Sequence, residues 1–156
     1  MVIKQLISFL LPITVTIGVP LNIESNIHVR STSLAIMGLL IMGMGLSGLV
    51  LTISAFLRIG KGTLAPWSPT KILVIHGLHR YVRNPMIMGV LAILIGESLA
   101  ILSLPIFLWA VIFFIVNTIL FITYEEPNLE RKFGEDYRVY KRNVNRWIPK
   151  LKPFKI

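Results

Sequence analysis

Long blocks of apolar residues constrain this chain more than any other feature of its sequence. Four stretches are long and apolar enough to cross a bilayer as helices, at about residues 5–21, 33–57, 86–104 and 105–124. The hydrocarbon core of a bilayer, about 30 Å thick, requires about 20 mostly apolar residues in a helix. Hydrophobic residues make up 54% of the chain, which excludes a disordered protein, and the absence of cysteine excludes a disulfide scaffold. We therefore expect an all-α fold, a single-domain integral membrane helical bundle with four transmembrane helices.

The ends and contacts of these helices follow from smaller features. The first stretch lacks a clear cleavage site, so we interpret it as a retained helix that is irregular near Pro12 and Gly18, and not as a signal peptide. The last two stretches abut at Ser103-Leu104-Pro105, which predicts a tight hairpin because proline suits the first turn of a helix. The second stretch contains small residues that predict close helix packing, at Gly38, Gly43, Gly45, Ser47 and Gly48.

The distribution of charge predicts the orientation of the bundle. Residues 58–85 contain five Lys/Arg and no acid, and residues 125–156 contain nine Lys/Arg and five Asp/Glu. Because positively charged loops stay in the cytoplasm, both segments and both termini are expected there, in a cell inner membrane or its equivalent. The net charge of +9 also favours contact with anionic membrane lipids. No module for nucleic acid is recognisable, so we do not expect that partner.

Two short patterns in the first basic segment resemble binding motifs but lack residues that those motifs require. Gly60-Lys61-Gly62-Thr63 lacks the earlier glycine that a phosphate-binding loop requires. His76 and His79 have no third ligand near them in the sequence, so we expect no metal site.

The segment after the fourth stretch predicts a further, amphipathic helix. Apolar side chains recur there at helical spacing, at Leu129, Phe133, Tyr137, Tyr140 and Val144, and the opposite face is charged. Such a helix is expected to lie at the cytoplasmic membrane surface, with Trp147 as an interfacial anchor.

Two adjacent acids where the fourth stretch ends are candidates for function. The Glu125 and Glu126 carboxylates repel each other, and a carboxylate facing lipid is costly, so at least one should meet a cation. Arg83, at the start of the third stretch, lies at the same predicted depth. The arrangement indicates either a structural ion pair or a ligand pocket that carries both signs of charge.

Polar residues inside the apolar stretches suggest a second element of the site. Glu97 lies near the middle of the third stretch, where an ionisable residue is a functional hypothesis by default. Asn117, Phe121 and Tyr124 share one helical face of the fourth stretch. We expect these four residues to line a substrate pocket.

A longer pattern covers about the last 100 residues. It consists of Gly77-Leu-His-Arg80-Tyr81-Val-Arg83-Asn84-Pro85, Glu125-Glu126, Phe133-Gly134-Glu-Asp-Tyr137-Arg-Val-Tyr140 and Arg146-Trp147-Ile-Pro149. This order of motifs resembles the isoprenylcysteine carboxyl methyltransferase and phospholipid methyltransferase family of membrane enzymes. The resemblance implies a methyltransferase that binds S-adenosylmethionine at the cytoplasmic membrane face without a Rossmann domain, in agreement with the absence of a G-x-G-x-x-G motif.

The resemblance also implies the residues of the site. The cofactor-binding residues would be Tyr81, Arg83, Asn84, Pro85, Glu125, Glu126, Leu129, Tyr137 and Tyr140. Arg146 and Glu126 would be catalytic, with Arg146 orienting an anionic acceptor. A glutamate would accept hydrogen bonds from the α-ammonium of the cofactor, and Arg83 or Asn84 would donate to its carboxylate. Two positions depart from the family pattern, because Asn84 stands where histidine is frequent and Ile87 where tyrosine is usual.

The expected function is methyl transfer from S-adenosylmethionine to a lipophilic, membrane-partitioning acceptor that carries a carboxylate, an amine or a thiol. Two alternatives remain open from the sequence. One is an NADPH-dependent membrane reductase of isoprenoids or sterols, and the other is a non-catalytic lipid-binding or transport scaffold. The sequence does not give the oligomeric state.

Overall fold

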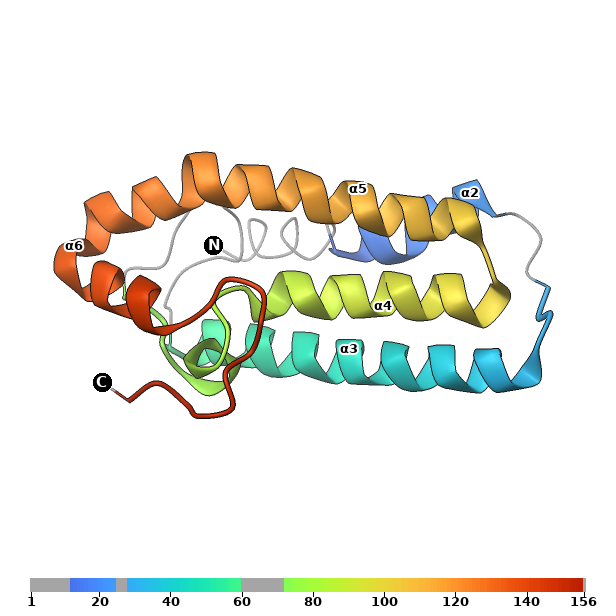
Figure 1. Cartoon of the computed structure of the whole chain (residues 1–156), viewed down its shortest axis with the longest axis horizontal. Coiled ribbons are helices and arrows are strands. Elements are labelled where there is room, and N and C mark those ends of the chain that lie inside the picture. Colours follow the sequence, from blue (N-terminus) through green and yellow to red (C-terminus); the bar gives the residue numbers. More distant parts are fainter. Residues whose placement is uncertain (1–11, 25–27, 60–71, 156) are drawn as a thin grey trace.

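The computed structural model describes residues 12–24, 28–59 and 72–155, and within them the chain is helical with no β-strand. The elements in order are η1 (Thr14–Gly18), α2 (Val19–Ile23), α3 (Thr32–Ile59), η2 (Gly77–Arg80), α4 (Pro85–Ile101), α5 (Leu104–Leu120), η3 (Phe121–Glu125) and α6 (Glu126–Asn143). Figure 1 shows α3, α4 and α5 running side by side, with α6 at one end of the bundle and α2 at the other. The all-α prediction is therefore confirmed for the described residues.

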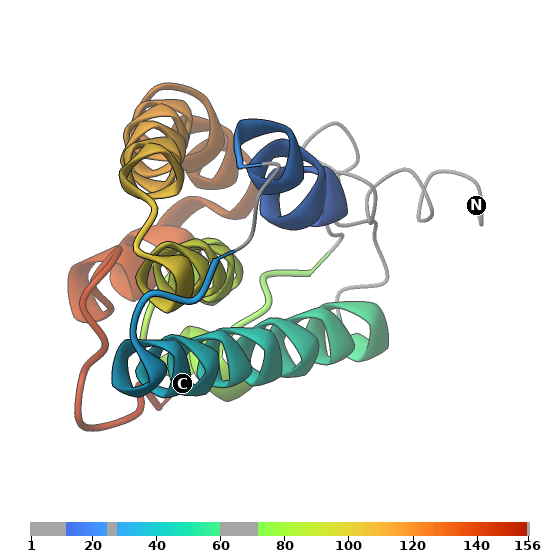
Figure 2. The same cartoon turned by 90° about the vertical axis from the view of Figure 1, so that its right-hand side faces the viewer.

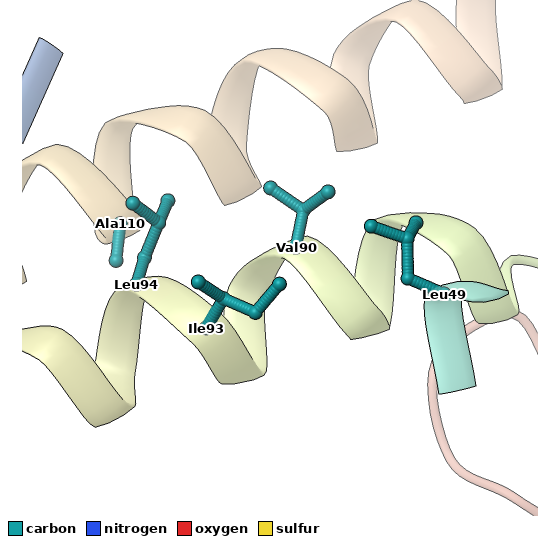
Figure 3. Close-up of a cluster of buried hydrophobic side chains, with 5 residues drawn as sticks. All are labelled: Leu49, Val90, Ile93, Leu94 and Ala110. Atoms are coloured by element: carbon teal, nitrogen blue, oxygen red, sulfur yellow. The ribbon is translucent and has the colours of Figure 1, made fainter. Parts of the chain in front are cut away.

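Helix α4 lies between α3 and α5, and both views show this order (Figures 1 and 2). The core forms where these three helices meet, around Leu49, Val90, Ile93, Leu94 and Ala110 (Figure 3). Each of these side chains is at most 8% exposed. Burying an aliphatic side chain of this size stabilises a fold by roughly 1.5–3 kcal/mol, so this cluster fixes α4 against both neighbours.

Two reciprocal pairs of glycines bring α3 and α4 into backbone contact. A Cβ added at Gly38 would lie 2.5 Å from the carbonyl oxygen of Gly96, and one at Gly96 would lie 2.6 Å from that of Gly38. Gly45 and Gly89 oppose each other in the same way, at 2.7 and 2.9 Å. Gly43 faces no atom within 4 Å. The predicted close packing of the second stretch is thus confirmed for Gly38 and Gly45, and Gly43 takes no part in it.

The predicted hairpin between α4 and α5 is confirmed. Leu102 adopts a left-handed conformation (φ 52°) after the last residue of α4, and Ser103 precedes α5 as its N-cap. The Ser103 hydroxyl accepts a hydrogen bond from the Ile106 amide (3.4 Å) and donates one to Glu24 (2.6 Å). The hairpin is therefore also hydrogen-bonded to Glu24, the residue that follows α2.

The N-terminal helix is irregular, as Pro12 and Gly18 predict. Its described part has π-helical geometry over η1 and continues directly into α2, which has Pro20 in its first turn. The indole of Trp109 donates a hydrogen bond to the Val15 carbonyl (3.2 Å), which joins η1 to α5. Residues 5–11 of the predicted first span lie outside the described residues.

From Leu104 to Asn143 the chain is helical through α5, η3 and α6 except at Gly134. The direction changes inside α6 at Gly134, whose φ of 55° and ψ of −127° suit only a residue without a Cβ. The apolar face predicted for this segment is confirmed. Tyr137, Tyr140 and Val144 are buried, and Leu129 and Phe133 pack against the cluster that they form with Ile75.

The interpretation of this face as a membrane-surface anchor was wrong. The chain itself covers the face, because Leu73, Ile75 and Phe154 pack on it. Trp147 is also not a free interfacial anchor, since its ring packs edge-on against Phe114 (5.1 Å between centroids) and Phe121 (6.0 Å) on the same side of the long helix.

Two described helices are long and apolar enough to cross a membrane: Thr32–Ala55 of α3, and the helix that begins at Leu104. Both expose apolar side chains that a water-soluble protein would bury, among them Leu40, Met44, Leu51, Leu104 and Ile119. Helices Thr14–Ile23 and Pro85–Ile101 are apolar but shorter than a full span. The structure thus supports an apolar helical bundle that associates with membranes.

Candidate functional site

The polar motifs singled out in the sequence meet at one end of the bundle, where α4 begins and η3 passes into α6 (Figure 1). Asn84 is the N-cap of α4 and Pro85 occupies its first turn, so Arg83 immediately precedes the helix. Glu125 and Glu126 lie at the junction of η3 and α6. The hairpin of α4 and α5 therefore brings the two motifs together, as their predicted depths suggested.

An ion-pair cluster centred on Glu126 joins three segments. Its carboxylate accepts hydrogen bonds from Arg83 (Nη1 to Oε1, 2.9 Å) and, in bidentate fashion, from Arg146 (Nε to Oε1, 2.6 Å; Nη2 to Oε2, 3.0 Å). Lys141 lies 3.3 Å from Oε2 and 2.7 Å from Glu130. The Glu126 side chain is only 4% exposed, so its carboxylate is nearly shielded from water, whereas Arg146 and Lys141 are partly exposed.

The surroundings of Glu126 keep it ionised. Burial by itself would raise its pKa, but the hydrogen bond from Arg146 and the charges of Arg83 and Arg146 bring the pKa below its ordinary value. The prediction that one acid of the pair meets Arg83 is therefore confirmed. Both oxygens of Glu126 are occupied by cations, which makes it the fixed centre of the cluster.

Glu125 differs from Glu126 in its ion pairing and in the direction in which its pKa is shifted. Within the described residues it has no ion pair, and it faces a small cavity of about 80 Å³. Burial raises its pKa to about 7, and repulsion by Glu126 acts in the same direction. The cavity is lined by Leu73, Val74, His79, Arg83, Asn84, Phe121, Glu125, Leu129, Tyr137 and Tyr140.

Unused hydrogen-bond donors lie on the same cavity. The side-chain nitrogen Nδ2 of Asn84 and the Nε of Arg83 are buried and have no partner among the described residues. Asn84 as a whole is only 6% exposed. A buried polar group without a partner costs roughly 1–3 kcal/mol, so such groups mark places where a ligand or an ion completes the structure. The cavity therefore combines an unpaired acid with unpaired donors.

Two tyrosines and a histidine form the rigid wall of the cavity. Tyr137 and Tyr140 are each 3% exposed, and the Tyr140 hydroxyl donates a hydrogen bond to the carbonyl of His79 (2.6 Å). Burial lowers the pKa of His79 to about 4, so its imidazole is neutral near pH 7. Among the described residues, no three metal-ligating side chains gather at one place.

The C-terminal segment fastens this wall by backbone hydrogen bonds. The Arg83 amide donates to Asn145 (2.9 Å), Lys150 donates to the Tyr81 carbonyl (2.9 Å) and Phe154 donates to the Arg80 carbonyl (2.9 Å). Tyr81 thus contacts the tail through its main chain, and its side chain does not line the cavity. No sequence pattern pointed to these contacts, because they use main-chain atoms.

The four residues predicted to form a substrate pocket do not meet. Phe121 lines the small cavity, Asn117 donates to the carbonyl of Phe113 one turn away (2.8 Å), and Tyr124 is 57% exposed. Glu97 lines a different cavity at the other end of α4. Leu73, Val74 and His79 are wall residues that the sequence reasoning did not assign to the site. Their only signal was their position just before the Arg-Asn-Pro motif.

Comparison with known proteins gives the family. The chain matches the phospholipid methyltransferase family over residues 34–136, which runs from the first turn of α3 into α6 and includes Arg83-Asn84-Pro85 and Glu125-Glu126. The chain belongs to the phospholipid methyltransferase family. The resemblance seen in the motifs is therefore confirmed, and membership implies a membrane methyltransferase. An uncharacterized protein of Haemophilus influenzae is 38% identical to this family member over 63 residues, which are 40% of the present chain and the whole of that protein. No solved structure matches the chain.

Proposed function

We propose that this phospholipid methyltransferase family member binds S-adenosylmethionine at the cavity beside Glu125 and transfers its methyl group to a lipophilic acceptor. One observation carries the proposal. Among the described residues, the Glu125 carboxylate has no ion pair and the buried Asn84 Nδ2 and Arg83 Nε have no hydrogen-bond partner, and these three residues line one small cavity. This pattern is complementary to the amino-acid end of the cofactor, which carries an ammonium and a carboxylate.

The residues present fit that end of the cofactor. A cavity of about 80 Å³ has room for only a few non-hydrogen atoms, the size of an amino-acid head group. Glu125 would accept hydrogen bonds from the ammonium, while Asn84 Nδ2 and Arg83 Nε would donate to the carboxylate. The nucleoside end would lie beyond the described cavity, against the apolar and aromatic wall of Leu129 and Tyr137.

Each side chain has a limited task in the reaction. S-adenosylmethionine supplies an electrophilic methyl group on a sulfonium, so the protein needs to position the reactants and needs no covalent intermediate. Glu126 holds Arg83 and Arg146 in place and is a positioning residue. Arg146 would orient an anionic acceptor only with the donor atoms that its bidentate pair with Glu126 leaves unused.

The membrane arrangement follows from charge. We propose that the chain crosses the membrane four times with both termini in the cytoplasm, which would put the basic segments 58–85 and 125–156 on one side, together with the cofactor site. The acceptor would enter from the lipid, where a membrane-partitioning molecule is already concentrated. Its reacting group is a carboxylate, an amine or a thiol.

Methyl transfer can be tested in proteoliposomes made from a mixed lipid extract, with S-adenosylmethionine carrying a tritiated methyl group. We expect radioactivity in the organic phase with the wild-type chain and not with Glu125→Gln. Release of the label by mild base would indicate a methyl ester, and stable label would indicate an amine or thiol. Glu135→Gln, an exposed acid on α6, is the matched control and should retain activity. Absence of label from folded wild-type protein contradicts the proposal.

A further inference from the structure

A second and larger cavity lies at the opposite end of the bundle. Its volume is about 340 Å³, and it is a partly open cavity lined by η1, α2, the first turns of α3, the last turns of α4 and the start of α5. Figure 1 shows these segments together at the end that carries α2, away from α6. Glu97 on α4 is 13 residues from Asn84, which corresponds to roughly 20 Å along the helix. The two cavities are therefore separate.

The lining of this cavity is apolar except for two acids and a threonine. Residues such as Leu39, Met42 and Ile106 form most of the wall. Thr16 has its hydroxyl proton engaged, since it donates to the Pro12 carbonyl at 2.7 Å. Glu24 and Glu97 also line the cavity, and no Lys, Arg or His is among the described residues that line it.

The two acids are held differently. Glu24 is fixed by the Ser103 hydroxyl, which donates to its Oε2 at 2.6 Å. The Oε2 of Glu97 is buried and has no hydrogen-bond partner in the described part of the chain. The neighbouring Ser98 cannot help, because its hydroxyl donates to the Ile95 carbonyl. An ionisable group at this depth in an apolar bundle is costly unless something pairs with it.

The chemistry of the wall specifies what would fill this space. Carboxylates only accept hydrogen bonds when ionised, so the complementary group is a donor, and a cation is the strongest one. The rest of the ligand must be apolar to match the wall. A volume near 340 Å³ lies at the lower end of the range for small-molecule sites, which suits one alkyl chain and excludes a two-chain phospholipid as the complete occupant.

The geometry points to a binding site for a lipophilic amine, a single alkyl chain that ends in an ammonium group. The ammonium pairs with Glu97 and reaches towards Glu24, and the chain occupies the space between α2, α3 and α5. This site is independent of methyl transfer, because none of its residues lines the cavity beside Glu125.

The test uses the full chain in nanodiscs of phosphatidylcholine and a matched pair of photoreactive probes. One probe is a dodecylamine with a diazirine in its chain, and the other is the corresponding dodecanol. Mass spectrometry maps the labelled residues after irradiation at equal probe content. We expect the amine to label segments 16–24 and 97–106 about tenfold more than the alcohol, the difference that one charge-assisted hydrogen bond provides. Unlabelled dodecylamine should compete.

Two variants distinguish the effect of the Glu97 charge from the effect of the cavity volume. Glu97→Gln preserves the shape of the side chain and should reduce labelling by the amine about tenfold, to the level of the alcohol. Ala35→Phe reduces the cavity without touching an acid and should reduce labelling by both probes. Glu135→Gln, far from the cavity on α6, should change nothing.

Equal labelling by amine and alcohol in the wild-type chain would overturn the proposal and show that the cavity takes any alkyl chain of the bilayer. Absence of label from the cavity would overturn it as well. If Glu97→Gln does not fold, the comparison of the two probes in the wild-type chain still decides the question.

Discussion

Glu125 and Glu126 are neighbours in sequence, and the structure predicts opposite effects for the same substitution. Glu126 is buried and bonded to Arg83 and Arg146, whereas Glu125 is half-buried and has no ion pair among the described residues. Glu126→Gln should therefore destabilise the fold. Glu125→Gln should leave its stability unchanged or increase it.

The size of each effect follows from burial. Breaking a buried ion pair costs about 3–5 kcal/mol, and the partial exposure of Arg146 favours the lower value, ~3 kcal/mol. For a chain of this length, that is a decrease of about 6–12 °C in Tm. The stabilisation by Glu126 is present above its unfolded pKa and is lost as the pH falls through its lower folded pKa.

For Glu125 the dependence of folding stability on pH is reversed. Its pKa rises on folding from 4.5 to about 7, so its contribution is favourable at low pH and is lost as the pH rises through 7. At pH 8 the ionised carboxylate costs the fold up to ~3 kcal/mol, which a neutral glutamine removes.

The assay is thermal unfolding in detergent at pH 8, followed by tryptophan fluorescence, since Trp147 packs beside Phe114 and Phe121 next to the cluster. Equal losses of Tm in the two variants, or a greater loss in Glu125→Gln, would refute the distinction drawn between the two acids.

Three further outcomes are expected. Gly96→Ala should lower the free energy of unfolding by about 1–3 kcal/mol, because the added Cβ would meet the backbone of α3 at 2.6 Å. Gly43→Ala has open space around the added Cβ and should be neutral. Thermal unfolding of both variants tests this. Gly134→Ala should cost about 1–3 kcal/mol in the same measurement, because alanine is strained at φ 55° and ψ −127°. Affinity for S-adenosylmethionine should increase about tenfold between pH 6 and 8, because the Glu125 carboxyl, with its pKa of about 7, ionises in this range. Calorimetry that finds no change, or the same change in Glu125→Gln, contradicts this.

Much of the fold could be predicted because apolar length and periodicity report it directly. The hairpin at Ser103 and the apolar face that includes Tyr137 and Tyr140 were both visible as local patterns. What covers that face was not visible. The same spacing suits a lipid surface or another segment of the chain, and only the fold brings Phe154 and Ile75 onto it.

The candidate site was predictable at the level of motifs but not of roles. The adjacent acids and Arg83 pointed to an ion pair, and the structure gives this pair to Glu126 and leaves Glu125 facing the cavity. In a helix, neighbouring side chains point in directions about 100° apart, so two adjacent carboxylates face different surroundings. The sequence alone does not show which of the two faces the cations. Glu97 and Asn117 were grouped because both are polar residues inside apolar stretches, and the bundle places Glu97 on another cavity.

The most direct test of the proposed function is calorimetric titration of the purified chain in detergent with S-adenosylmethionine. The proposal predicts one binding site per chain in the wild type. It also predicts affinity at least about tenfold weaker in Glu125→Gln, equivalent to one charge-assisted hydrogen bond, with unchanged affinity in Glu135→Gln. No binding by well-folded wild-type protein, or equal binding by Glu125→Gln, would contradict the cofactor site assigned to this cavity.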